Sequence, residues 1–455
     1  MSGGSAGPAR VSPRRVALAS FIGTAVEFYD FLIYGTAAAL VFPKLFFPSA
    51  SPAAGVLLSF ATFGVGFFAR PLGGIVFGHF GDRLGRRRML VYSLVGMGVS
   101  TVLIGLLPTY AQIGLAAPIL LTLLRLAQGF AVGGEWGGAT LMAVEHASAR
   151  RRGFYGAFPQ MGAPAGTAAA TLAFYLAAQL PDDQFLSWGW RVPFLVSAIL
   201  IVIGLVVRLT VTESPDFAAL QHHSELARTP IVAAVRRHWR EILLIAGAYL
   251  SQGVFAYICV AYLVSYATTA AGIPRQWALL GVSIGAVVAV ATYPVFGALS
   301  DRVGRKPLYL AGVVAMGLAV VPTFALIDTG RPGLFVVALV LIFGLAMAPA
   351  AGVTGALFSM SFDADVRYSG VSMGYTLSQV VGSAFAPTIA TALYAAFGTS
   401  TAIAAYLIGV SVISAIAVCF LPGGWRAPDE SARLSGGGPA AAGKDAEPES
   451  STATG

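Results

Sequence analysis

Long apolar stretches recur along the whole chain and restrict the folds that it can adopt. A bilayer core of about 30 Å requires about 20 consecutive apolar residues in a spanning helix, and the sequence holds about twelve runs of that length. The runs are continuous and too long for the strands of a membrane barrel, so helices are expected. The predicted spans are 17–40, 53–78, 89–108, 113–143, 154–180, 190–211, 241–268, 278–299, 307–327, 333–359, 370–396 and 399–421.

The few charges of the chain support this interpretation. Charged residues make up 11% of the 455 residues and the mean hydropathy is +0.78, whereas soluble domains carry about 25% charged residues. The net charge of +8 does not indicate a nucleic-acid partner, because the basic residues gather in alternate loops and only Lys44, Arg275 and Arg331 fall in the others. This asymmetry predicts a multi-pass protein of the plasma (inner) membrane with both termini in the cytoplasm.

The spans form two groups on either side of a polar stretch. The sequence therefore predicts an all-α integral membrane fold of two pseudo-symmetric six-helix bundles, 1–211 and 241–425. The stretch between them, 212–240, is charged and is predicted to be a cytoplasmic linker with a short amphipathic helix on the membrane surface. The tail, 426–455, is rich in Gly, Ala, Pro and Glu and is predicted to be disordered.

An internal repeat relates the two halves. The pattern G-x-x-x-D-R-x-G-R-[RK] begins at Gly78, between spans 2 and 3, and again at Gly297, between spans 8 and 9. Duplicated helix units commonly place a transport site between two bundles. We interpret both loops as gates, because Asp82 and Asp301 can accept a hydrogen bond from a neighbouring arginine and face a helix amino terminus. The alternative is a solvated basic loop that sets the membrane topology. The candidate gating residues are Gly78, Asp82, Arg83, Gly85, Arg86, Glu145, Asp301, Arg302, Gly304 and Arg305.

The doubled loop resembles motif A of the major facilitator superfamily, and Arg125–Gly129 resembles its R-x-x-Q-G motif. Further segments resemble the metabolite:proton symporter family within it, and the resemblance covers about residues 15–425. It implies twelve helices, alternating access and a monomer. In the segment 359–367, Arg367 matches the family's P-E-x-F-P-T-x-x-R pattern but the glutamate and prolines are absent, which leaves open how the second half closes its cytoplasmic side. The segments that carry the family resemblance are 19–35, 133–138, 188–194 and 213–215.

Five ionisable residues fall inside spans, where a charge is costly and marks a functional site by default. A rise of about 1.5 Å per residue puts Glu27, Arg70 and Arg125 near the middle of the membrane. The arginines suit a carboxylate, because a guanidinium meets it through two parallel donors. Glu27, Asp30 and Glu135 are the candidate proton-coupling acids, since a carboxylate in a low-dielectric site holds its proton more readily than in water. The alternative is a set of ion pairs that hold the helices together.

Uncharged polar residues inside spans complete the candidate site. Together with Arg70 and Arg125, the predicted substrate-binding residues are Tyr34, Gln128, Tyr249, Gln252 and Gln379. No metal or other cofactor is expected, because Cys259 and Cys419 suit helix packing and the histidines lie at cytoplasmic helix ends. No nucleotide loop, zinc motif or nucleophile–base set is present, so an enzyme is not expected.

The predicted function is secondary active transport across the lipid bilayer. The favoured hypothesis is uptake of a small organic acid or zwitterion by symport with a proton. The alternative is an exporter or exchanger of a small metabolite or drug, driven by proton antiport. The sequence leaves the substrate, the stoichiometry and the acid that carries the proton open.

Overall fold

The computed structural model describes residues 13–84, 86–133, 140–141, 143–144, 147–210, 230–362 and 367–422, and these parts are helical apart from short turns. The long helices of the first half each coincide with a predicted span. They are α1 (Pro13–Leu40), α3 (Pro52–Leu84), α4 (Arg86–Leu106), α6 (Ala116–Val132), α8 (Arg152–Ala177) and α10 (Val192–Thr210). Short helices connect them, namely α2 (Phe42–Leu45), α5 (Tyr110–Ile113) and α9 (Asp182–Ser187).

Three spans of the second half contain a π-helical segment next to α-helix. The first is α12 (Pro230–Tyr257), η3 (Ile258–Tyr262) and α13 (Leu263–Thr269). The other two are α16 (Pro332–Leu339), η4 (Val340–Ala346), α17 (Ala348–Ala351) and α18 (Thr354–Ser359), and α19 (Arg367–Ser378), η5 (Gln379–Ser383) and α20 (Ala386–Phe397). The remaining three are α14 (Arg275–Val303), α15 (Arg305–Ile327) and α21 (Ser400–Phe420).

Most of these helices are apolar enough to cross a bilayer unaided. Within the described ranges, nine helical segments meet the length and hydropathy expected of a span, and Val91–Leu106 and Ala116–Val132 are shorter apolar helices. The glycine- and proline-containing α8 accounts for the one further predicted span. Each predicted span thus contains a helix, and the predicted all-α membrane fold is confirmed.

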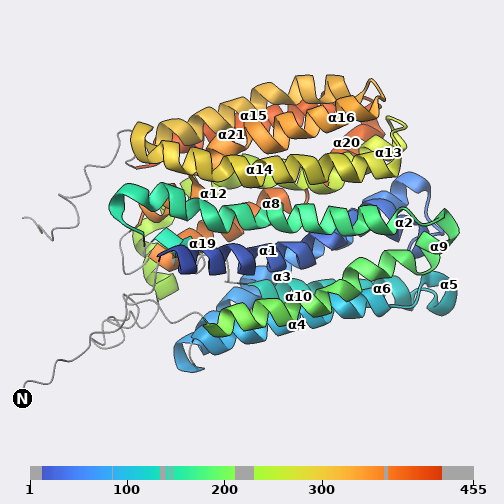
Figure 1. The fold of residues 1–455 in the computed structure, drawn as a ribbon, viewed down its shortest axis with the longest axis horizontal. Helices are drawn as coiled ribbons and strands as arrows, with labels where there is room; N and C mark the ends of the chain where they lie inside the picture. The colour runs from blue at the N-terminus through green and yellow to red at the C-terminus, as the bar shows by residue number, and fades with distance from the viewer. Residues whose placement is uncertain are drawn as a thin grey trace, which may run out of the picture.

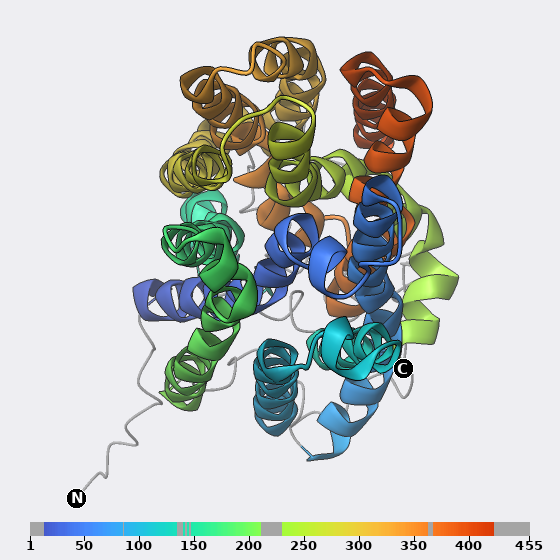
Figure 2. The ribbon, with the colours of Figure 1, turned by 90° about the vertical axis from the view of Figure 1, so that its right-hand side faces the viewer.

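The helices gather into two groups that meet along α8 and α14 (Figures 1 and 2). Helix α8 belongs to the first half and α14 to the second, and glycines let their backbones approach. A Cβ on Gly297 of α14 would lie 2.7 Å from the carbonyl oxygen of Gly153 on α8, so a larger residue there would push the halves apart. Close approach through small residues is typical of membrane helices.

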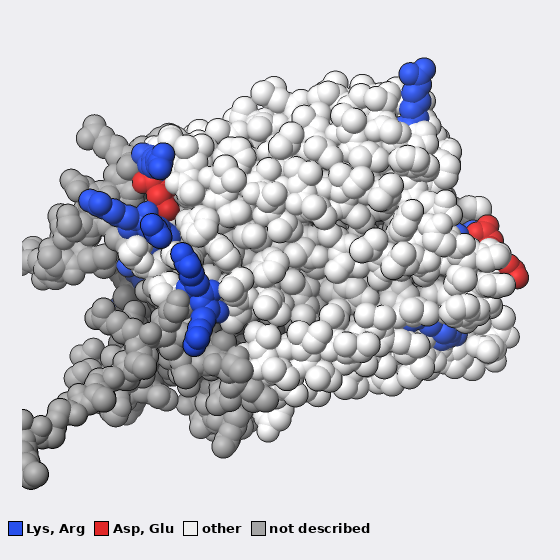
Figure 3. All heavy atoms as spheres, in the orientation of Figure 1, with Lys and Arg blue, Asp and Glu red and all other residues white. Residues whose placement is uncertain are grey.

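On the face seen in Figure 3, the charged side chains lie at the two ends of the molecule, with a wide uncharged belt between them. We call the end where α1 begins and α14 ends the basic end; its exposed residues include Arg14, Arg150 and Arg302. The opposite end contains α9 and the start of α14. On the belt, apolar side chains such as Leu318 and Val381 are exposed, as expected of a surface that faces lipid.

The linker is described only in part, and the tail lies outside the described ranges. Residues 211–229 and 423–455 lie outside the described ranges. From Pro230 onward the linker is helical, and a non-helical residue, His238 (φ −129°, ψ 28°), separates this first part of α12 from the spanning part.

Candidate functional site

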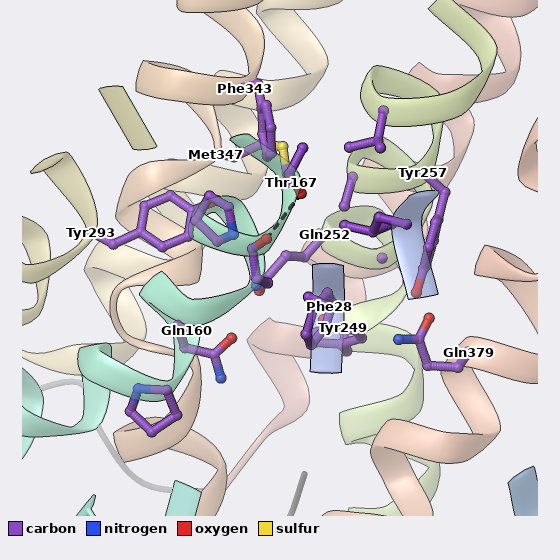
Figure 4. Close-up of a pocket in the computed structure, with 17 residues that line it drawn as sticks. Phe28, Gln160, Thr167, Tyr249, Gln252, Tyr257, Tyr293, Phe343, Met347 and Gln379 are labelled. Atoms are coloured by element: carbon purple, nitrogen blue, oxygen red, sulfur yellow. Dashed lines mark hydrogen bonds between the residues drawn. The ribbon is translucent and has the colours of Figure 1, made fainter. Parts of the chain in front are cut away.

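A cavity lies between the two halves, enclosed by α1 and α8 on one side and by α12, η3, α14, η4 and η5 on the other (Figure 4). It contains about 580 Å³ of empty space, including the part open to solvent. Its lining residues carry no ionised side chain, so ligand contacts in this conformation would be hydrogen bonds and aromatic packing.

Three glutamines from three helices supply most of the polarity of the cavity. Gln252 accepts a hydrogen bond from Thr354 Oγ1 (2.7 Å), and Gln379 Nε2 donates to the hydroxyl of Tyr375 (2.8 Å). Gln160 Nε2 and Gln379 Oε1 have no hydrogen-bond partner among the described residues, although both side chains are buried. An unpaired buried amide is costly, so these two groups are candidate ligand contacts.

Aromatic rings cover much of the remaining cavity wall. Phe28 comes from α1, Tyr249 from α12, Tyr257 from the end of α12, Tyr293 from α14 and Phe343 from η4, and Figure 4 shows them around the space between Gln160 and Gln379. Rings of this kind bury large apolar area at fixed geometry. The arrangement suits a compact ligand with both an apolar body and hydrogen-bonding groups.

The two buried arginines lie behind this wall, in the first half. Arg125 has no exposed surface, and its guanidinium carbon lies over the rings of Phe31 (3.9 Å to the centroid) and Tyr34 (4.3 Å). Arg70 lies over Phe31 (4.2 Å) and Phe67 (4.6 Å). Cation–π contacts are strongest when they are desolvated. Here they hold both guanidinium groups near the cavity, although neither arginine lines it.

Arg125 also organises a hydrogen-bond network inside the first half. Its Nη1 donates to Gln128 Oε1, and Gln128 Nε2 donates to the backbone oxygen of Asp30 (3.0 Å) and to Thr101 Oγ1 (2.8 Å). The Tyr34 hydroxyl donates to Thr62 Oγ1 (2.8 Å). Tyr34, Gln128 and Arg125, predicted as substrate contacts, therefore do not line the cavity in this conformation.

The candidate acids have different surroundings. Glu27 is buried on α1 and lies within electrostatic range of Tyr257 and Tyr375 of the second half. Asp30 is fully buried inside the first half, beside the Ser197 hydroxyl of α10, and its carboxylate has no partner that meets hydrogen-bond geometry in the described parts of the chain. Glu135 lies outside the described residues.

At the basic end, the aspartate of the second repeat contacts the other half. Asp301 accepts hydrogen bonds from the backbone N–H groups of Gly153 (2.8 Å) and Phe154 (3.2 Å) at the amino terminus of α8. A carboxylate is favourable at a helix amino terminus, where the helix dipole is positive. Arg305 Nη2 lies 3.8 Å from the same carboxylate.

The rest of the second repeat packs within its own half. Gly304 has φ +107°, a backbone conformation that favours glycine. Arg305 is buried and donates a hydrogen bond to Met360 Sδ. Lys306 Nζ donates to the carbonyl oxygens of Cys419 (2.9 Å) and Leu421 (2.6 Å). Arg302 is exposed. Among the gating candidates of the first half, Gly85 and Glu145 lie outside the described residues, as do the side-chain surroundings of Gly78, Asp82, Arg83 and Arg86.

The opposite end has a second contact between α14 and the α8 region. Arg275 Nη2 donates to the carbonyl oxygen of Ala178 (3.2 Å), just after α8, and its Nη1 lies 3.1 Å from Asp182 Oδ1. Gln276 Nε2 donates to the same carbonyl (3.3 Å). Helix α14 of the second half thus contacts the start of α8 at the basic end and the residues just after α8 at the opposite end.

Sequence reasoning missed three residues of this arrangement. Gln160 had a usable signal, since it is a lone amide between Pro159 and Pro164 in a predicted span. Tyr257 and Arg275 had none, because one is a tyrosine in an aromatic-rich span and the other a single loop charge. Only their contacts with the other half, seen in the structure, distinguish Tyr257 and Arg275 from other tyrosines and loop arginines.

Comparisons with known proteins agree with this architecture. The model of the family described as "Sugar (and other) transporter" matches residues 16–238, and that of the "Major Facilitator Superfamily" matches residues 280–448. A shikimate transporter of Escherichia coli (strain K12) is 43% identical over 91% of this chain and 95% of its own length. A proline/betaine transporter of Salmonella typhimurium is 33% identical over 89% of this chain and 82% of its own length.

Solved structures share the fold at low sequence identity. A D-xylose-proton symporter superposes with a TM-score of 0.68 at 20% identity, over 90% of this chain and 97% of that chain. The xylose transporter from E. coli in an inward-open conformation gives a TM-score of 0.66 at 16% identity, over 91% of this chain and 97% of that chain.

Proposed function

The chain belongs to the major facilitator superfamily, within its metabolite:proton symporter family, and we propose that it imports a small organic acid or zwitterion together with a proton. It is a multi-pass membrane transporter and not an enzyme. Relatives named for shikimate and for proline and betaine suggest the substrate range. The observation that carries the proposal is a polar cavity shared by the two halves and bordered by buried ionisable groups.

The neutral cavity wall and the arginines behind it suggest two levels of recognition. Gln160, Gln252 and Gln379 would bind the substrate through hydrogen bonds, with Tyr249 against its apolar part. Arg70 and Arg125 would supply a positive field that favours a carboxylate, since charges act over several ångströms where the dielectric constant is low. In this proposal the arginines need not touch the substrate in the conformation described.

We assign the coupling proton to Glu27 rather than Asp30. Glu27 lies within range of two tyrosines of the second half, one of which lines the cavity, so its protonation can respond to the substrate. Asp30 is enclosed by its own half beside Ser197. A buried carboxylate without a cation is strongly disfavoured, so Asp30 would stay protonated throughout the cycle.

Alternating access would use the contacts at the two ends of α14. The positive-inside rule places the basic end in the cytoplasm. Opening to the cytoplasm would then separate Asp301 from the amino terminus of α8, and opening to the outside would separate Arg275 from Ala178 and Asp182. Both contacts are formed in this structure, so in this proposal it would represent a state closed at both ends of α14.

The test is uptake into proteoliposomes of labelled shikimate, α-ketoglutarate, proline and glycine betaine under an imposed pH gradient. Symport predicts that at least one compound accumulates when the outside is acidic, and that an uncoupler abolishes the accumulation. Accumulation only when the inside is acidic would indicate proton antiport and support an exporter. Exchange of internal for external substrate with no response to the gradient would contradict proton coupling.

A further inference from the structure

One ring of the second half inserts into an aromatic cluster of the first half. Tyr257 packs against Phe67 (centroids 5.2 Å apart), Phe63 (5.5 Å) and Phe31 (6.1 Å). Among the ring contacts of the described residues, no other cavity-lining side chain of the second half touches these three rings. Tyr257 therefore belongs to the cavity wall and to the packing of the other half.

The same rings support the buried arginines. Arg70 lies over Phe31 and Phe67, and Arg125 lies over Phe31 and Phe63. Tyr257 thus packs against the same three phenyl rings that the two guanidinium groups contact. A change in its position would be transmitted directly to the groups that hold the two cations.

The hydroxyl of Tyr257, whose side chain is only 3% exposed, lies beside the Gln379 amide but makes no contact of full hydrogen-bond geometry in the described parts of the chain. Figure 4 shows it pointing toward the amide of Gln379, whose Oε1 also makes no contact of that geometry. Two buried polar groups that face each other without a well-formed hydrogen bond indicate a position where a ligand atom could bind between them. The titratable groups within electrostatic range of this hydroxyl are Glu27, Arg70, Arg125, Tyr249 and Tyr375.

The backbone next to Tyr257 changes from α-helix to π-helix. The π-helical segment η3 starts at the following residue, Ile258. Short π-helical segments inside α-helices are frequent at functional sites. A ligand that bound the Tyr257 hydroxyl could therefore move the ring without displacing the whole helix.

We propose that Tyr257 is the positioning residue that couples occupancy of the cavity to protonation of Glu27. This inference rests on the proposed function. A tyrosine hydroxyl donates one hydrogen bond and accepts others. When the cavity is empty, that proton is available to stabilise an ionised Glu27. When the hydroxyl donates this proton to the substrate, its oxygen can only accept hydrogen bonds from the first half. It then interacts favourably with the Arg70 cation and with the protonated form of Glu27.

Reciprocity follows from this coupling. If substrate binding favours protonation of Glu27, then protonation must strengthen substrate binding by the same factor. The empty carrier would bind the substrate weakly until a proton arrives, and it would release both together. Tyr257 achieves this without itself exchanging its proton with water.

The experiment compares Tyr257→Phe with Tyr293→Phe in proteoliposomes. Phe keeps the ring and removes the hydroxyl, and Tyr293 is a matched control because it also lines the cavity at 3% exposure but makes none of the ring contacts with the first half that are found for Tyr257. The probe is labelled shikimate, or labelled proline if the wild-type protein carries proline instead. Two quantities are measured: counterflow with equal pH on both sides, and accumulation under a pH gradient.

For Tyr257→Phe we expect counterflow within about threefold of the wild type and accumulation reduced about tenfold, with loss of the pH dependence of the counterflow KM. Tyr293→Phe should change both quantities in proportion and keep the pH dependence. A second variant, Tyr257→His, retains a ring and a donor and should recover part of the accumulation. It also provides the test if Tyr257→Phe does not insert into the membrane.

The inference is overturned if Tyr257→Phe accumulates substrate as the wild type does, or if it loses counterflow and accumulation equally while Tyr257→His recovers neither. Failure of the proposed function looks different. In that case the wild-type protein itself would show no accumulation under the pH gradient, and the inference would fall with it.

Discussion

Arg70 and Arg125 place their guanidinium carbons over one and the same ring, that of Phe31, at 4.2 and 3.9 Å from its centroid. Two cations on neighbouring helices thus share a single aromatic support on α1, one turn after Glu27. The geometry links the helix that carries the candidate coupling acid to both helices that carry the cations.

Replacing the shared ring should therefore impair transport more than it impairs folding. Desolvated cation–π contacts contribute about 2 kcal/mol each, so Phe31→Leu should lower the rate of uptake at limiting substrate by about tenfold or more. Phe174→Leu is the matched control, since Phe174 is a fully buried phenylalanine of the same half with no described arginine over its ring. Uptake and thermal unfolding are measured for both variants, and equal losses of uptake would contradict a special role for Phe31.

The two acids of α1 should behave differently when neutralised. Glu27→Gln should abolish accumulation under a pH gradient while counterflow survives, because exchange does not require the proton to be released. Asp30→Asn should retain accumulation within about threefold, since we expect Asp30 to be protonated already in its enclosed site. The measurement is the ratio of accumulation to counterflow. If the Glu27 variant still concentrates substrate, the coupling assignment is wrong.

The contacts at the two ends of α14 should bias the carrier in opposite directions. Asp301→Asn removes the charge from the α8 amino terminus and should favour opening at the basic end, whereas Arg275→Gln should favour opening at the opposite end. A loss of about 1 kcal/mol would change the ratio of the two states about fivefold. Labelling rates of single cysteines placed near each end report the shift. Shifts in the same direction for both variants would contradict the assignment of the two gates.

The unpaired amide of Gln160 should contribute to substrate affinity. Gln160→Leu removes one hydrogen bond, which is expected to raise KM about tenfold at little cost in protein stability. Gln179→Leu changes an exposed glutamine just beyond the same helix and should leave KM unchanged. Unaltered KM in both variants would show that Gln160 does not contact the substrate.

The sequence predicted the helices well because each is a long, continuous apolar run, and length alone separates such runs from loops. Counting residues along each helix also predicts that Glu27, Arg70 and Arg125 lie near the membrane centre. The sequence could not tell which way the side chains point, because a helix surrounded by lipid and other helices has no single polar face. Glu27 and Asp30 are therefore equivalent candidates in the sequence, although the structure gives them different neighbours.

The sequence also could not show which residues line the cavity. Gln128 and Gln160 are both lone amides in predicted spans, yet Gln128 is bonded to the Asp30 backbone and to Thr101 while Gln160 lines the cavity. Contacts between halves separated by more than a hundred residues, such as that of Asp301 with Gly153, depend on the packing of α8 and α14. The repeat indicated that the aspartate would face a helix amino terminus but not which helix.

The most direct test is to follow protons and substrate together in the wild-type protein. Liposomes containing the carrier and an internal pH dye, with no initial gradient, receive labelled substrate from outside. The account predicts that the interior acidifies as the label enters, in a fixed ratio that Glu27→Gln abolishes. Entry of the label with no change of internal pH, or with alkalinisation, would contradict it.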